Sequence, residues 1–128
     1  DCPGHFPRTG WATSSEYADE EHEKVLSQMC SSLSSRHDEI LRGGRFRVGV
    51  AQKALNLYLK YLWCAGWIRE PPHCPFDSIL ISHLPAKDRV SWTLLDDIAE
   101  YRSLVMAARK VAAGRSLSVW ELMEYNRR

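Results

Sequence analysis

The sequence contains no uninterrupted run of about 20 apolar residues, which is the length that a helix needs to cross a bilayer. Its most apolar segment, residues 48–65, is interrupted by Lys53 and Lys60. The residues given also contain no pattern of the secretory signal-peptide type. These absences argue against a membrane-spanning segment, and we expect a cytoplasmic protein with no membrane partner.

Acidic residues are absent from the whole segment between Arg42 and Arg69, which contains six basic residues. By contrast, residues 1–41 hold eight acids and three bases, and residues 70–128 hold eight of each. The formal net charge of +1 provides no overall field that would attract a polyanion. Any such attraction must be local to residues 42–69, unless the acidic segment faces these bases in the fold and neutralises them.

Cysteines are few for a chain of 128 residues: Cys2, Cys30, Cys64 and Cys74. Four cysteines permit two disulfides in three alternative pairings. A chain of this length with 45% hydrophobic residues and five tryptophans can build a core without such cross-links. We therefore predict reduced thiols, with Cys64 buried as a small apolar side chain.

The most apolar segment predicts a central helix over residues 48–65, VGVAQKALNLYLKYLWCA. Its polar residues recur at spacings of three and four, so they share one face: Gln52, Lys53, Asn56 and Lys60. The other positions are mostly apolar or aromatic, a wider apolar surface than an ordinary amphipathic helix has. We expect other elements to cover this helix on several sides, Lys53 and Lys60 to be solvated, and Gly66 to end it in a left-handed conformation.

Capping residues and periodicity predict further helices on both sides of the central one, giving an all-α, single-domain bundle of about five helices. Residues 1–13, rich in Pro and Gly, are expected to form an irregular N-terminal arm. A first helix is predicted over residues 14–41, with a break as an alternative at the serines in 31–35. Its first turns are crowded with acids, which favour a helix N-terminus.

Three shorter helices are predicted after the Pro-rich connection at residues 67–76. Asp77 is the expected N-cap of a helix over residues 78–84, with a strand at 79–81 as the alternative. Thr93 is the expected cap of the next helix, which has the clearest apolar periodicity in the chain and ends at Gly114. Ser118 and Glu121 form a capping-box pattern for the last helix.

The residues that lead into the central helix, LRGGRFRVG at 41–49, combine three glycines with three arginines. A helix N-terminus offers unpaired N–H groups and a partial positive charge, and arginine binds phosphate through two hydrogen bonds. The pattern is not a nucleotide-binding P-loop, because it lacks the order G-x-x-x-x-G-K-[ST]. We predict that DNA, RNA or another polyanion contacts this entry. The expected contacts are Arg42, Gly44, Arg45, Arg47, Gly49, Lys53 and Lys60.

Simpler interpretations stay open beside this one. The glycines can form an ordinary turn between two helices, with the arginines solvated. Alternatively, the protein is an interaction or oligomerisation module without catalytic activity, in which the acidic segment of one copy pairs with the basic segment of another. Light scattering that finds a monomer at high concentration would argue against such a homo-oligomer.

Two patterns carry possible catalytic or metal chemistry, and each has a simpler explanation. Lys53 among apolar neighbours could lose its proton and attack a sugar or carbonyl carbon with help from Asp77. A Cys-x-x-His pair at 2–5 and the adjacent pair at 73–74 supply ligands of the zinc type, but adjacent residues aim poorly at one ion. We assign no catalytic residue, no cofactor and no metal ligand.

Several short motifs between residues 48 and 125 carry a resemblance. They are the helix with Ala51, Lys53 and Leu55, the PFD motif at 75–77, the helix with Tyr101, and the SLS and WEL motifs at 116–118 and 120–122. This pattern resembles bacterial proteins described as having an oxoguanine DNA glycosylase fold. It is also similar to uncharacterised helical proteins of bacterial and mobile-element genomes with an AQKxLNLYLKYLW-type helix and a PPHCPxD loop. The resemblance implies an all-α fold, nucleic-acid binding and, as a third hypothesis, a DNA-repair glycosylase or lyase. Arg47 stands where the glycosylase hairpin would have glycine, so no catalyst is assigned.

Overall fold

The computed structural model describes residues 15–37 and 47–127, and the side chains of residues 19–33 and 47–127. Every regular element in these ranges is helical: α1 (Ser15–His37), α2 (Val48–Cys64), α3 (Ser78–Ile81), η3 (Ala86–Asp88), η4 (Trp92–Leu94), α4 (Ile98–Ala112) and α5 (Leu117–Asn126). The predicted all-α single domain is confirmed. The predicted N-terminal arm lies outside the described residues.

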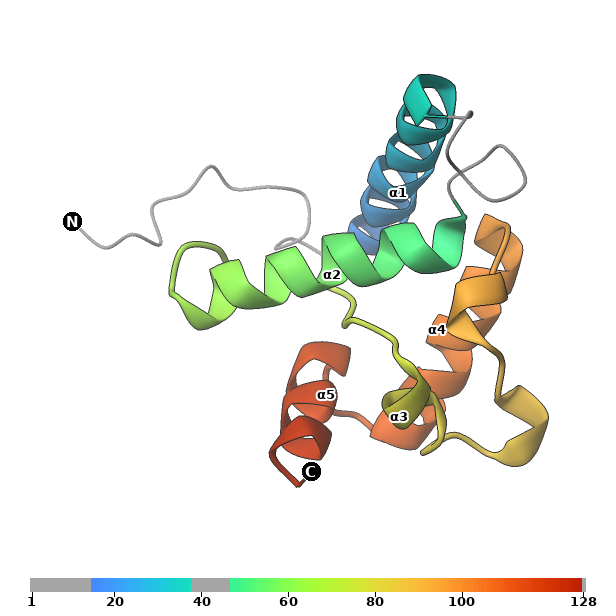
Figure 1. Cartoon of the computed structure of the whole chain (residues 1–128). Helices are drawn as coiled ribbons and strands as arrows, with labels where there is room; N and C mark the ends of the chain where they lie inside the picture. The colour runs from blue at the N-terminus through green and yellow to red at the C-terminus, as the bar shows by residue number, and fades with distance from the viewer. Residues whose placement is uncertain (1–14, 38–46, 128) are drawn as a thin grey trace.

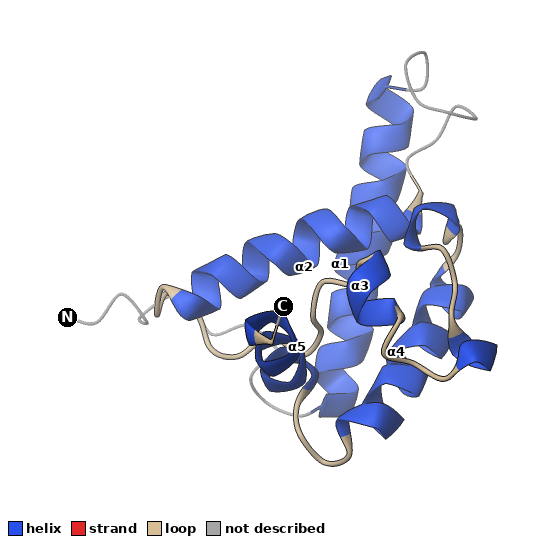
Figure 2. Cartoon of the chain, turned by 60° about the horizontal axis from the view of Figure 1, so that its bottom comes forward, coloured by secondary structure: helices blue, strands red, loops and turns tan. Residues whose placement is uncertain are grey.

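The helix α2 runs across the molecule, and the other elements cross it or lie to one side of it. In Figure 1, α1 crosses α2 steeply, while α3, α4 and α5 lie below α2. The connection over residues 65–77 turns back at the end of α2 and runs beneath it to α3 (Figures 1 and 2). Contacts join α2 to α1, η4 and α4, and α5 to α3 and α4.

The apolar core lies where these elements meet, and every α-helix contributes to it. Its fully buried side chains include Leu26 from α1, Ala51 from α2, Phe76 from the connection, Leu80 from α3, Tyr101 from α4 and Trp120 from α5. Burial of each large apolar side chain stabilises the fold by about 1.5–3 kcal/mol. The sequence-distant helices are therefore held as one body.

Several predicted helix ends are confirmed. The helix α2 begins at Val48 and ends at Cys64, and Gly66 has a φ of 82°, as its left-handed role requires. The Asp77 carboxylate accepts a hydrogen bond from the Leu80 N–H at 2.8 Å, so Asp77 caps a short helix and the alternative strand is wrong. The serines did not break the first helix before His37.

Two predicted caps were wrong because tertiary contacts shift the helix start. Residues 92–94 form a separate 3₁₀ turn, and the side chain of Asp97, not that of Thr93, caps α4 through the Glu100 N–H. In α5 the cap is Ser116, which accepts from the Val119 N–H. Ser118 is buried two residues later, where its hydroxyl donates to the Pro71 carbonyl at 2.9 Å.

The polar face of α2 points into the protein, contrary to the expectation that it is solvated. Gln52 and Asn56 are fully buried. Gln52 pairs with the backbone of Phe76: its Nε2 donates to the carbonyl at 2.8 Å, and its Oε1 accepts from the N–H at 3.1 Å. These bonds satisfy a buried backbone segment that has no helix of its own, which explains why polar residues are needed on the inner side. Part of the apolar surface of α2 is consequently turned outward.

Candidate nucleic-acid interface

The entry of α2 is built around Gly49, which has a packing role. The Gly49 N–H donates to the Leu95 carbonyl at 3.0 Å. A Cβ at this position would lie 1.6 Å from the Trp92 carbonyl oxygen, so only glycine permits η4 to pack here. The Gly49 N–H therefore already has an acceptor within the protein and is not available as the predicted anion donor. Arg42, Gly44 and Arg45 lie outside the described residues.

Two of the predicted cations stand at this end of α2 with their charge available. Arg47 is the residue before the first turn, is partly exposed and makes no side-chain cap. The Lys53 Nζ lies 4.7 Å from the centre of the Trp92 ring and is also partly exposed. Within the described ranges, neither side chain forms an ion pair with a carboxylate. A contact with an aromatic ring orients a lysine and leaves its net charge in place.

Lys60 does not belong to this group of available cations. Its Nζ lies 3.0 Å from Glu121 Oε1 and 4.2 Å from the centre of the Tyr125 ring. The side chain of Lys60 is 12% exposed and that of Glu121 is 5% exposed. This pair joins α2 to α5, so the predicted phosphate contact at Lys60 is replaced by a structural ion pair.

The outward side of α2 carries large apolar side chains, contrary to the prediction that other elements cover this helix on several sides. Tyr58 is 58% exposed and Tyr61 is 62% exposed, and Trp67 in the following turn is 46% exposed. Together with Val50 and Ala54 they define the outer face of α2. The positions 50, 54, 58 and 61 follow helical spacing and include no charged residue, which is the sequence signal that marks this face.

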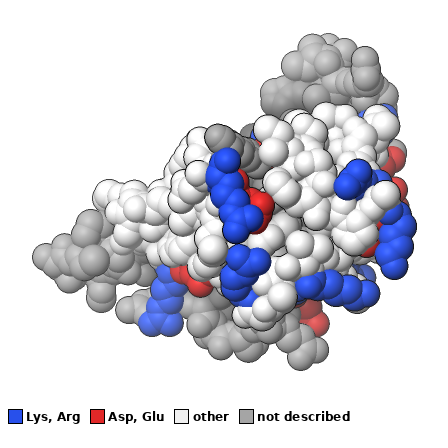
Figure 3. All heavy atoms as spheres, turned by 90° about the horizontal axis from the view of Figure 1, so that it is seen from below, with Lys and Arg blue, Asp and Glu red and all other residues white. Residues whose placement is uncertain are grey.

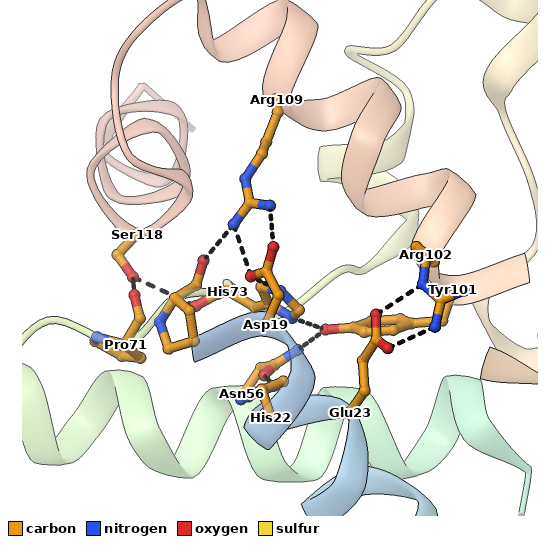
Figure 4. Close-up of polar contacts among 11 residues, drawn as sticks. Asp19, His22, Glu23, Asn56, Pro71, His73, Tyr101, Arg102, Arg109 and Ser118 are labelled. Atoms are coloured by element: carbon orange, nitrogen blue, oxygen red, sulfur yellow. Dashed lines mark hydrogen bonds and ion pairs between the residues drawn. The ribbon is translucent and has the colours of Figure 1, made fainter. Parts of the chain in front are cut away.

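A buried polar network lies on the opposite side of α2 and connects four segments of the chain (Figure 4). The His73 Nε2–H donates to Asp19 Oδ1 at 2.8 Å, and its Nδ1 accepts from the Tyr101 hydroxyl at 2.5 Å. The same hydroxyl accepts from Asn56 Nδ2 at 3.2 Å. The Asn56 Oδ1 in turn accepts from His22 Nε2–H at 2.7 Å. With Nδ1 as an acceptor and Nε2–H as a donor, His73 is a neutral imidazole with its proton on Nε2.

The electrostatics of this network follow from its burial. Burial lowers the pKa of His22 to about 3, and it also lowers the pKa of His73 against the opposing effect of Asp19. Burial alone would raise the pKa of Asp19. The hydrogen bonds from His73 and Arg109, together with the Arg109 charge, outweigh burial and hold that pKa well below its ordinary value. His73 and Tyr101 have almost no exposed surface, so this network fastens helices together and offers no reactive atom to a substrate.

The structure also bears on the cysteine thiols, on metal binding and on membrane-spanning helices. Burial raises the pKa of the Cys74 thiol, which opposes formation of a nucleophilic thiolate. Cys64 is exposed, so its predicted burial was wrong, and Cys30, Cys64 and Cys74 are free thiols. Among the described side chains, no three His, Cys, Asp or Glu residues are grouped so that they could hold a metal ion. No helix in the searched ranges has the length and apolar character that a bilayer crossing requires.

Comparison with known proteins does not indicate a function, so the function is inferred from the structure. The resemblance to oxoguanine DNA glycosylase-fold proteins, and with it a bacterial or mobile-element origin, stays a prediction. The chain matches no family model, no curated protein and no solved structure.

Proposed function

We propose that this protein binds nucleic acid at the N-terminal end of α2, with Arg47 and Lys53 as phosphate contacts. The segment over residues 42–69 contains no acidic residue, so an approaching phosphate meets no fixed negative charge on α2 itself. Arginine suits phosphate because its planar guanidinium donates two parallel hydrogen bonds. Lys53, six residues further along the chain, adds a point charge.

The proposal depends on which basic residues form ion pairs with the acids of α1. Asp19 receives two hydrogen bonds from Arg109, at 2.5 and 3.0 Å. Glu23 receives two from Arg102, at 2.7 and 3.1 Å. Both arginines belong to α4, as Figure 4 shows. Among the described side chains, the arginines that pair with acids of α1 thus belong to α4, and no basic residue of α2 does so, which supports an available charge at Arg47 and Lys53.

The opposite side of the molecule fits a phosphate backbone less well. Figure 3 shows the face below α2, where Lys and Arg side chains are spread over several places and several stand beside Asp or Glu. One such pair joins Arg127 to Glu124 at 3.4 Å. A dispersed and partly neutralised set of charges gives a weaker local field than neighbouring cations without acids.

A salt titration of binding tests the proposal. Fluorescence anisotropy of a labelled oligonucleotide should report an affinity that falls steeply as salt rises, because bound phosphates release counterions. Arg47→Ala should weaken binding and make the slope of log K against log salt shallower by about 1, the value for one lost phosphate contact. Lys87→Ala removes an exposed positive charge from η3, away from α2, and is the control, with no expected effect. Binding that is absent, or that ignores salt, would refute the proposal.

An interaction module is the second candidate, and the exposed outer face of α2 favours it. Exposed apolar surface on a small protein often marks a contact with another protein. Under this alternative, light scattering would find a dimer whose fraction grows with concentration. Substituting Tyr61 with lysine would dissociate that dimer.

A further inference from the structure

The outer face of α2 has the composition of a surface that stacks bases. Its exposed groups are the rings of Tyr58, Tyr61 and Trp67, set beside Val50 and Ala54. Every nucleobase has a π-face, so aromatic rings on an accessible surface bind bases with little dependence on sequence. Paired bases in a duplex hide these faces against their neighbours, whereas a single strand can present them.

Basic residues stand at both ends of this aromatic face. Arg47 immediately precedes α2, and the exposed Arg69 follows Trp67 by two residues. The 17 residues of α2 cover about 25 Å at 1.5 Å per residue, a distance that several nucleotides of an extended strand can follow. Between these ends the outer face itself bears no charge of either sign. Phosphates of a bound strand can therefore meet cations at the ends while bases lie on the rings.

We propose that the outer face of α2 binds single-stranded nucleic acid by stacking unpaired bases on Tyr58, Tyr61 and Trp67. This inference rests on the proposed function and specifies its substrate class. Arg47 and Lys53 hold the backbone, and the aromatic rings select strands with accessible bases. Duplex nucleic acid meets only the cations and binds more weakly.

The charges of α2 oppose the main alternative occupant, a second copy of this chain. A two-fold axis parallel to α2 would place the Arg47 residues of the two copies together, and one perpendicular to α2 would pack the two helices antiparallel, with identical surfaces in contact. Arg47 of one copy would then face the Arg69 end of the other, and the face supplies no acidic residue to separate them. Such juxtaposition of like charges is unfavourable at an interface. A polyanion has the complementary charge.

The experiment compares a labelled oligothymidylate with a duplex of the same length, using the full chain and fluorescence anisotropy. Tyr61→Ala should weaken single-strand binding by about 5- to 150-fold, which is the range for loss of one stacked base, and should leave duplex binding unchanged. Tyr61→Phe keeps the ring and should bind like the native chain. Tyr125→Ala removes another exposed tyrosine, from α5, and is the control.

The possible results separate this inference from the proposed function. Single-strand binding that depends on the Tyr61 ring, together with weaker binding of both ligands in Arg47→Ala, supports both proposals. Equal affinity for the two ligands with no effect of Tyr61→Ala overturns base stacking and leaves phosphate binding standing. Failure to bind either ligand overturns both. A dimer in light scattering that Tyr61→Ala dissociates assigns the outer face to self-association and overturns the inference.

Discussion

Replacing Gln52 with leucine tests how α2 holds the connection that precedes α3. The two side chains are similar in size, so the change removes hydrogen bonds while creating little empty volume. Gln52 satisfies both backbone groups of Phe76, at 2.8 and 3.1 Å, in a fully buried setting. In the variant the Phe76 N–H and carbonyl lose these partners without regaining water.

The expected loss of stability is large relative to the total. Each buried backbone group left unpaired costs about 1–3 kcal/mol, so Gln52→Leu should lower the free energy of unfolding by about 2–6 kcal/mol. A domain typically has only about 5–15 kcal/mol of stability. The loss of the Asn56 hydrogen bond to Gln52 Oε1, at 3.1 Å, acts in the same direction.

Urea unfolding followed by circular dichroism at 222 nm measures this change. Gln28→Leu makes the same substitution at an exposed position of α1 and should stay within about 0.5 kcal/mol of the native chain. Amide exchange offers a local readout, because the Phe76 N–H should lose protection in Gln52→Leu. A change below about 1 kcal/mol with an unaltered m-value would show that these bonds do not matter to the fold.

Three further perturbations follow from the packing and charges. Gly49→Ala places a Cβ against the Trp92 carbonyl. This overpacking should lower the free energy of unfolding by about 1–3 kcal/mol and so lower the thermal midpoint. An unchanged midpoint would contradict the close contact. The depressed pKa of His22, about 3, means that the unfolded chain binds its proton first as pH falls, so stability should decline from about pH 6.5 toward pH 3 by up to about 1.4 kcal/mol per unit. His22→Gln should flatten that decline in urea midpoints measured against pH, and an identical slope would argue against a buried neutral imidazole. Glu121→Ala leaves Lys60 buried without its partner and should cost about 3–5 kcal/mol in urea unfolding, whereas the double variant Lys60→Met with Glu121→Leu should recover most of the loss.

Local sequence signals predicted the elements of this fold well. The limits of α2, the turn at Gly66 and the cap at Asp77 each depend on residues within one helical turn. Caps were misplaced where a distant group intervened. Ser118 donates to the carbonyl of Pro71, 47 positions away, and no local pattern records that partner.

The orientation of α2 was the main error, and its cause is physical. Helical spacing divides α2 into a polar and an apolar side but does not say which side is buried. Gln52 can be buried because the backbone of Phe76 supplies its hydrogen-bond partners. Asn56 can be buried because the His22 ring nitrogen and the Tyr101 hydroxyl supply its partners. The candidate interface changed accordingly: Lys60 was lost to Glu121, and Tyr58 and Tyr61 emerged on the surface.

The polar network around Tyr101 also affects how the protein unfolds. Its members come from α1, α2, α4 and the connection before α3, and Asp19 lies 90 positions from its partner Arg109. If α1 detached alone, His73 and Asn56 would each lose a partner at the centre of the protein. Detachment of α1 would therefore leave buried polar groups without partners in α2 and in the connection before α3, which costs free energy. Amides in α1 and α4 should consequently exchange with solvent together, in a single cooperative opening.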